Sequence, residues 1–395
     1  MAFATIGTKG IEDASIATAD IANNAVTSAK TSGIPARPNA MPLVINGSMA
    51  VAQRGTSSTG LTSSAYNTVD RFKTNISGLG TWTETQESLT SGNAYTDGFS
   101  NALKIDCTTA DASPAASDRL YWTYRFEGQD VQLLKKGTAN AEKVTVAFWI
   151  KATKTGTNIL ELYDNDNSRQ VSASYTVSTT DTWEHKVVSF PADTSGVLGD
   201  DNGSSLFITW ALGAGSNYTS GTLNTSWAAN TNANRYVGQV NHGDSTSNNV
   251  HITGVQMEVG EYTSSTIPPF QHEEYGENLA RCQRYFNMIC EGSQKPIGNG
   301  LFWEAQEVFV TMPINGSTMR TTPSIYQTTG TDYFWAYRNG AADGLTELTL
   351  NGSSSERVIT FYVGSSQGLA SDTKNRPVFF RSGQTASRLG LDAEL

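Results

Sequence analysis

Residues 254–286 constrain the fold more than any other stretch, because a strand, a proline pair and a helix follow one another there. Alternating apolar and polar residues predict a strand with one buried face, its apolar positions being Val255, Met257 and Val259. Pro268-Pro269 then ends extended structure, because proline lacks an amide donor and restricts the preceding residue. Apolar residues next recur at spacings of three and four, at Tyr275, Leu279, Cys282, Phe286 and Ile289. This run therefore predicts a helix over residues 273–292 that links two β-domains.

Bulk composition narrows the class of protein. A chain of 395 residues is too long for one ordinary core and predicts two or three domains. The net charge of −10 argues against a nucleic-acid partner, because no basic excess is present to displace counterions. No apolar run reaches the length of a membrane span, and the first residues lack a secretion signal. We therefore expect neither nucleic-acid binding nor membrane insertion.

The cysteines and acidic turns predict neither a metal site nor a cofactor. Cys107, Cys282 and Cys290 lack the paired spacing of zinc sites or disulfide frameworks, which predicts buried thiols in a chain that folds in a reducing cytosol. Residues 193–203 are rich in oxygen ligands for Ca²⁺ but do not match the EF-hand spacing. A solvated turn is the favoured interpretation of that run.

The N-terminal residues contain a repeat with a period of five, formed by Ile6, Ile11, Ile16, Ile21 and Val26. This period fits neither a heptad coiled coil nor an amphipathic helix. A lone chain cannot bury such a stripe, so the repeat predicts wrapping against sister chains. The alternative is a flexible polar leader with chance spacing. Residues 1–42 are thus expected to be an oligomerisation segment that ends in a proline-stiffened linker at 33–42.

Two mostly β regions follow. Residues 43–272 alternate short strands with polar turns, which predicts a β-sandwich whose inward rows are Leu120, Trp122, Tyr124 and Phe126; Val144, Val146, Phe148 and Ile150; and Leu206, Ile208, Trp210 and Leu212. The apolar phase slips near Gly254, where a β-bulge can absorb one residue. Residues 293–395 predict a second, smaller β-sandwich with strands at 308–312, 324–328, 333–338, 357–363 and 377–381. Asn339-Gly340 supplies a hairpin turn.

Four segments resemble a family of phage fibre proteins. The segment 254–286 resembles that family's strand-to-helix junction, which ends in a "CQRYY"-like motif. Residues 46–55, followed by Tyr66 and residues 70–72, resemble its first strand, and residues 319–323 resemble its "MRxxP" element. Residues 389–395 resemble its "DAEL" ending. The four matches occur in the expected order and span most of the chain from Val44 onward. In addition, residues 144–151 and 183–190 resemble paired strands of carbohydrate-binding jelly rolls.

The resemblance implies a virion fibre. Residues 1–42 would anchor a homotrimer to other virion proteins, residues 43–272 would form a jelly-roll β-sandwich, and residues 273–292 would form the linking helix. The β-domains, including residues 293–395, would bind a host cell-surface glycan on a virion assembled in the host cytoplasm. A tail fibre is the first expectation. The alternatives are a capsid (head) fibre or decoration protein, a polysaccharide depolymerase tailspike, and a carbohydrate-binding module of a secreted hydrolase.

Two sets of aromatic residues are candidates for carbohydrate binding. Tyr333, Trp335 and Tyr337 alternate with other residues and are expected on one strand face, where sugar C–H groups can stack on them. The alternative, which we favour from sequence alone, is that they fill the core or a trimer interface. Trp227, in an asparagine-rich loop, is the second candidate.

Catalysis has little support in the sequence. The four histidines are scattered, and neither a nucleophile elbow nor a zinc-protease motif accompanies them. Glycosidases need two carboxylates about 5–10 Å apart, which Glu258 and Glu261 cannot be assigned from sequence. We therefore expect a binding protein and no enzyme.

Overall fold

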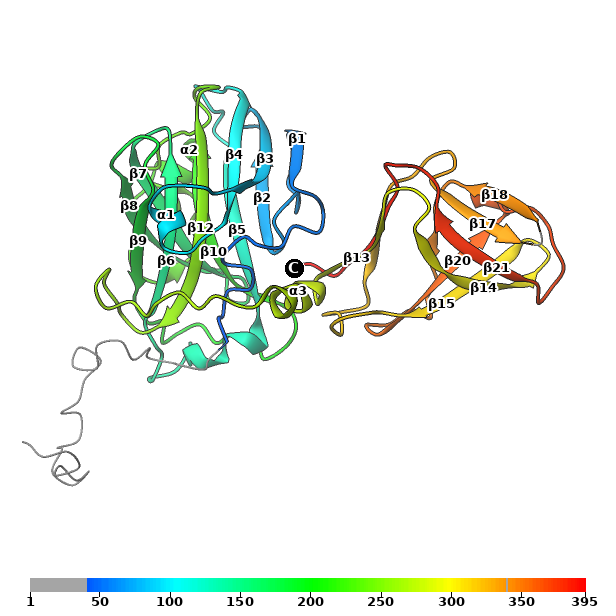
Figure 1. Cartoon of the computed structure of the whole chain (residues 1–395). Coiled ribbons are helices and arrows are strands. Elements are labelled where there is room, and N and C mark those ends of the chain that lie inside the picture. The colour runs from blue at the N-terminus through cyan, green and yellow to red at the C-terminus, as the bar shows by residue number, and fades with distance from the viewer. Residues whose placement is uncertain (1–40, 339) are drawn as a thin grey trace, which may run out of the picture.

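The computed structural model describes residues 41–338 and 340–395, which form two β-sandwiches joined through a short helix (Figure 1). The predicted repeat residues Ile6, Ile11, Ile16, Ile21 and Val26 lie outside the described residues. The expectation of a mostly β chain with two sandwiches and a short linking helix is confirmed. Within the described part of the chain, no helix is long and apolar enough to cross a membrane.

The first sandwich is a jelly roll of two six-stranded antiparallel sheets. One sheet has the order β1 (Ser57–Leu61), β3 (Thr81–Ser88), β4 (Asn101–Thr109), β12 (Asn249–Val259), β6 (Val144–Ala152) and β9 (Glu184–Phe190). The other has the order β11 (Ala228–Ala229), β8 (Arg169–Val177), β7 (Gly156–Asp164), β10 (Ser204–Ala214), β5 (Arg119–Glu127) and β2 (Phe72–Ser77). The short helices α1 (Asn93–Thr96) and α2 (Ser216–Thr219) lie in the connections.

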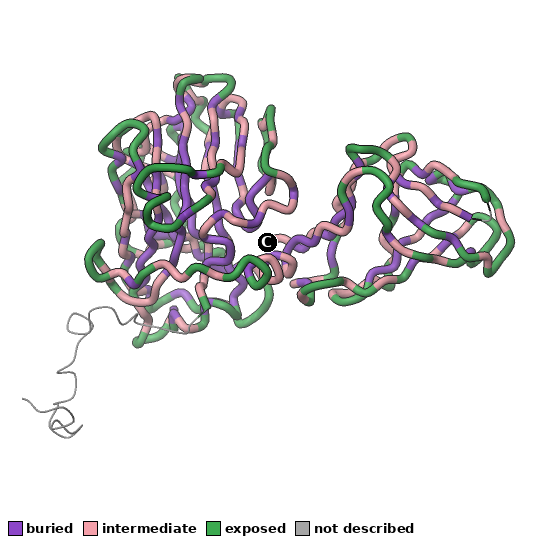
Figure 2. Tube along the Cα trace, in the orientation of Figure 1, coloured by how far each residue is buried: buried purple, intermediate pink, exposed green. Residues whose placement is uncertain are grey.

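The core of the jelly roll lies between these sheets, whose strands are mostly buried in Figure 2. The three predicted inward rows are all buried there, on β5, β6 and β10. Phe148 of one sheet meets Trp210 of the other edge-on, with ring centroids 5.8 Å apart. Alternation alone therefore identified both inner faces, because every second side chain of a strand points to the same side.

The predicted bulge is confirmed in β12. Its register against β6 shifts between Thr253 and Gln256, and Gly254 has a φ of 60°. A Cβ at this position would lie 2.6 Å from the ring of Phe99. Glycine is required both for the left-handed backbone and for this close approach.

The expected helix over residues 273–292 is wrong in its second half. Helix α3 covers only Tyr275–Gln283 and is capped by the Glu274 carboxylate, which accepts from the amide of Glu277. Phe286–Glu291 instead forms strand β13, which pairs with strand β22 (Arg388–Asp392). Tertiary pairing overrides the helical spacing here, because Phe286 is fully buried against the edge of the Tyr326 ring.

The second sandwich packs a three-stranded sheet against a seven-stranded one. The small sheet is β13, β22 and β16 (Ser324–Gln327); the large sheet has the order β18 (Ala341–Leu345), β17 (Phe334–Arg338), β21 (Pro377–Ser382), β14 (Pro296–Glu304), β15 (Glu307–Pro313), β20 (Val358–Gly364) and β19 (Thr349–Leu350). All five predicted strands are confirmed, as is the hairpin between β17 and β18. Strand β14 was missed because Gly298 and Gly300 interrupt its apolar pattern.

The last residues of the chain return to the jelly roll, so the C-terminus lies between the two sandwiches (Figure 1). Glu394 pairs with the buried Arg71 at 2.5 Å, and Asp392 pairs with Arg54 at 3.0 Å. The carbonyl oxygen of Leu395 accepts from Arg125 at 2.6 Å. We call residues 392–395 the tail. Its contacts are charge-assisted and largely buried, so they orient one sandwich on the other.

All three cysteines are buried and none forms a disulfide, as expected from their spacing. Cys107 belongs to the core of the jelly roll and Cys290 to that of the second sandwich. Cys282, on α3, packs in a separate cluster with Ile45, Val51 and Tyr285 between the helix and the jelly roll. These thiols act as small apolar side chains.

Candidate functional site

Strand β17 presents two of the predicted aromatic residues on the outer face of the seven-stranded sheet. Phe334 and Ala336 are buried, whereas Trp335 and Tyr337 are only partly buried. The rings of Trp335 and Tyr337 lie side by side with centroids 6.1 Å apart. Tyr333 precedes the strand and packs against the core of the second sandwich. The structure therefore brings two of the three candidate aromatics together.

Neighbouring strand β21 adds an aromatic ring and a cation to this pair. Trp335 lies opposite Arg381, and Tyr337 lies opposite Phe379, which is 38% exposed. The guanidinium of Arg381 lies 4.1 Å from the centroid of the Tyr337 ring and donates a hydrogen bond to its hydroxyl. Directly opposed residues share a sheet face, so these four side chains form one surface.

The apolar surface continues across the next three strands. Leu301 of β14 lies opposite Phe309 of β15, which in turn lies opposite Tyr362 of β20. Trp303, also on β14, is 59% exposed, and its ring lies 6.5 Å from that of Phe309. We call this surface the outer aromatic face; its members are Trp335, Tyr337, Phe379, Leu301, Trp303, Phe309 and Tyr362. Contiguous exposed apolar surface of this kind marks an interaction site.

Polar groups border the outer aromatic face. Asn299 lies opposite Phe379, and the hydroxyl of Tyr362 donates to Glu307 at 3.3 Å. Loss of hydration and the adjacent Glu307 carboxylate raise the pKa of Tyr362. Lys374 lies 5.1 Å from the Trp303 ring centroid and pairs with Glu304 at 3.0 Å. The face therefore combines flat apolar rings with neutral, positively charged and negatively charged side chains that can form hydrogen bonds.

Trp227, the other sequence candidate, is held by structural contacts at one end of the jelly roll. Its indole N–H donates to the carbonyl oxygen of Pro191 at 2.8 Å, and its ring packs against the core. The ammonium of Lys136 lies 4.4 Å from its ring centroid. The structure thus places Trp227 in the jelly roll and β17 in the other sandwich, and the contacts of Trp227 already use its indole.

The oxygen-rich run at residues 193–203 is engaged by cations of the protein itself. Asp193 pairs with Lys136 at 2.7 Å and with Arg169 at 2.8 Å. Burial alone would raise the pKa of Asp193, but hydrogen bonds from Arg169 and Lys136 lower this pKa to about 2. This carboxylate is therefore ionised and neutralised by side chains. Among the described residues, no group of three or more His, Cys, Asp and Glu side chains is arranged to hold a metal ion.

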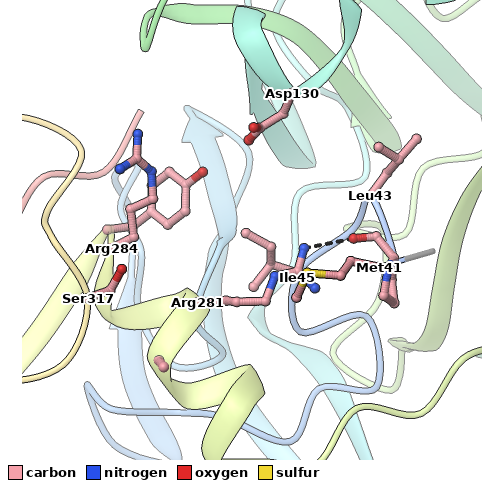
Figure 3. Close-up of a pocket in the computed structure, with 10 residues that line it drawn as sticks. Met41, Leu43, Ile45, Asp130, Arg281, Arg284 and Ser317 are labelled. Atoms are coloured by element: carbon pink, nitrogen blue, oxygen red, sulfur yellow. Dashed lines mark hydrogen bonds between the residues drawn. The ribbon is translucent and has the colours of Figure 1, made fainter. Parts of the chain in front are cut away.

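A cavity of about 420 Å³ lies where helix α3 meets the start of the described chain (Figure 3). Met41 and Ile45 form part of its apolar wall, and Arg281 on the helix and Arg284 just after it lie beside the cavity. Both arginines are engaged: Arg281 donates to the carbonyl oxygen of Pro42 at 2.7 Å, and Arg284 forms two hydrogen bonds to Glu127 at 2.6 and 2.7 Å. This cavity is a junction between segments distant in sequence, which is why no sequence pattern indicated it.

Comparison with known proteins gave partial likenesses in fold. No family model and no curated protein matches the chain. Among solved structures, a putative sugar binding protein from Bacteroides thetaiotaomicron is 14% identical, with a TM-score of 0.30 over 55% of this chain and 100% of that one. The family 11 carbohydrate-binding module from Clostridium thermocellum is 9% identical, with a TM-score of 0.26 over 55% and 99%. The enzymatically active domain of tailspike protein 4 of bacteriophage CBA120 is 11% identical, with a TM-score of 0.27; the match spans 55% of this chain and 21% of that chain.

Proposed function

We propose that the protein is a phage virion fibre that binds host-surface carbohydrate through the outer aromatic face. The observation that carries the binding surface is the pair Trp335 and Tyr337, side by side on an exposed sheet with Arg381 beside them. Sugar rings expose C–H groups that stack on aromatic faces, while their hydroxyls need donors and acceptors. Arg381, Asn299 and the Tyr337 hydroxyl supply those groups at the border.

The virion role is supported by the sequence resemblance and the N-terminal repeat. In this proposal, the five in-phase apolar residues of residues 1–42 wrap against sister chains in a homotrimer and dock on another virion protein. A tail location is proposed first, and the same segment would serve a capsid fibre or decoration protein. The chain binds its glycan without cleaving it.

Substitution of the central aromatic pair tests the binding surface. We expect Trp335→Ala and Tyr337→Ala each to weaken binding to immobilised capsular polysaccharide or lipopolysaccharide about tenfold or more, because truncating a stacked aromatic costs roughly 1.4 kcal/mol or more. Tyr275→Ala is the matched control, since Tyr275 is 57% exposed on α3, away from this face. Dissociation constants from biolayer interferometry give the comparison.

Three outcomes would overturn parts of the proposal. Wild-type affinity in Trp335→Ala would remove the outer aromatic face from glycan binding. Shortened glycan after incubation would show an enzyme, as expected of a depolymerase tailspike. A stable monomer of the full chain by solution mass measurement would exclude the homotrimer.

A further inference from the structure

A second, smaller pocket lies on the jelly roll, over the outer side of the sheet that contains β12, β6 and β9. It has a volume of about 120 Å³ and is walled by the residues after α1 and by the segment 267–270. Figure 1 shows α1 and its flanking loop crossing this side of the sheet. The residues that give it chemical character are Asp97, Trp149, His185, Gln256, Pro269 and Phe270.

Trp149 forms the aromatic floor of this pocket. It lies on the outer side of β6, opposite His185 of β9, and the two rings are 5.1 Å apart at their centroids. Its indole N–H donates to one carboxylate oxygen of Asp97 at 3.1 Å, which fixes the ring. Trp149 and His185 are both partly exposed, so an aromatic surface is open to a ligand.

Hydrogen-bonding groups converge beside this floor. Asp97 is exposed, and the indole bond uses only one of its oxygens. Burial lowers the pKa of His185, against the opposing effect of Asp97, so the ring is neutral at pH 7 and offers one donor and one acceptor nitrogen. Gln256 donates its side-chain N–H to the carbonyl oxygen of Pro268 at 3.0 Å, which leaves the amide oxygen as an acceptor at the pocket.

The bulge at Gly254 is what brings Gln256 to this side of the sheet. Thr253 pairs with Trp149, so an unbroken register would place Val255 opposite Ala147. The structure instead pairs Gln256 with Ala147 and buries Val255 completely in the core. Bulges re-aim side chains in this way next to binding sites. A polar side chain thus enters the pocket at the cost of an interrupted ladder.

We propose that this pocket binds a single neutral sugar ring, stacked on Trp149 and hydrogen-bonded by Asp97, His185 and Gln256. The volume of about 120 Å³ and the single indole floor suit one sugar ring. Among the described residues that line it, none is Lys or Arg, so an anionic ligand has no counter-charge. The site is separate from the outer aromatic face, and it rests on the proposed function only for the class of ligand.

Saturation-transfer NMR on the full-length protein tests this pocket. The probes are the methyl glycosides of glucose, galactose and N-acetylglucosamine, titrated one at a time. We expect at least one of them to receive saturation from the wild-type protein and to bind at least tenfold more weakly to Trp149→Ala. Asp97→Ala should weaken binding similarly, and because Asp97 is exposed this variant should leave the fold intact. Far-UV circular dichroism checks the fold of both.

Trp335→Ala separates this inference from the proposed function. We expect it to leave binding of the methyl glycoside unchanged, because Trp335 belongs to the other sandwich. The pocket is refuted if no glycoside receives saturation, or if Trp149→Ala and Asp97→Ala both bind like the wild type. It is also refuted if Trp335→Ala abolishes glycoside binding. Retained polysaccharide binding in Trp149→Ala would leave the outer aromatic face standing, so the two proposals fail independently.

Discussion

Neutralising Glu394 should loosen the junction between the two sandwiches. Its carboxylate lies 2.5 Å from Arg71 and 3.5 Å from Arg54, and the three side chains are 4%, 1% and 2% exposed. In Glu394→Gln, Arg54 keeps its ion pair with Asp392 at 3.0 Å. Arg71 keeps no carboxylate partner, but it still contacts a backbone carbonyl and the rings of Tyr285 and Tyr124, whose centroids are 3.3 and 5.3 Å from its guanidinium.

The magnitude follows from the charge left unpaired. Removing one partner of a buried ion pair costs about 3–5 kcal/mol. The glutamine amide oxygen still accepts one hydrogen bond, so we expect the lower end, about 3 kcal/mol. The matched control is Glu304→Gln, because Glu304 pairs with Lys374 at a surface where the two side chains are 57% and 53% exposed. Such an exposed pair contributes about 0–1 kcal/mol.

Hydrogen exchange of the tail measures this difference directly. The amide of Ala393, next to Glu394, donates to the carbonyl oxygen of Tyr285 at 2.7 Å, so it exchanges only when the tail detaches from the segment that joins α3 to β13. A loss of 3 kcal/mol should speed its exchange by roughly a hundredfold. If exchange in Glu394→Gln rises no more than in Glu304→Gln, the buried pair does not hold the junction and the argument fails.

Two further predictions concern the jelly roll. Gly254→Ala should lower the free energy of unfolding by about 1–2 kcal/mol more than Gly60→Ala. Both glycines have positive φ, but a Cβ at Gly254 would meet Phe99, whereas a Cβ at Gly60 would meet nothing within 4 Å. If urea unfolding shows that both variants lose the same free energy of unfolding, this prediction is wrong. His242 is fully buried and bonded to Asn158 at 2.8 Å, and burial, aided by nearby Lys154, lowers its pKa to about 4. Because the unfolded chain takes up this proton near pH 6.5, stability should fall by about 3 kcal/mol as the pH drops from 6.5 to 4. In His242→Gln the free energy of unfolding should depend less on pH. The assignment is refuted if urea unfolding at several pH values from 6.5 to 4 gives the same pH dependence as in the wild type.

The jelly-roll core could be predicted from sequence, because strand alternation is a local property. Trp122, Phe148 and Trp210 were assigned to inner faces by period alone, and the slip of that period located the bulge at Gly254. The end of helix α3 could not be predicted this way. Phe286 satisfies helical spacing, and only the partner strand β22, a hundred residues later, makes it a strand residue.

Only part of the candidate site could be predicted from the sequence, because the pairing of distant strands is not a local property. Trp335 and Tyr337 share a strand, so their common face follows from alternation. Phe379 and Leu301 join them through cross-strand register, which one sequence does not reveal. The jelly-roll pocket also needed the fold, because Asp97 and Trp149 come from segments more than fifty residues apart and meet only when α1 crosses the sheet.

The return of the tail also sets an order of events during synthesis. Arg71 and Glu394 are separated by 323 positions, so their pairing cannot form until residue 394 has left the ribosome. The jelly roll contains its own complete set of strands by residue 259 and can fold while the second sandwich is still being made. Until residue 394 appears, Arg71 must remain hydrated or bind another anion. The two sandwiches can therefore dock in their final orientation only late, after the second sandwich has been synthesised.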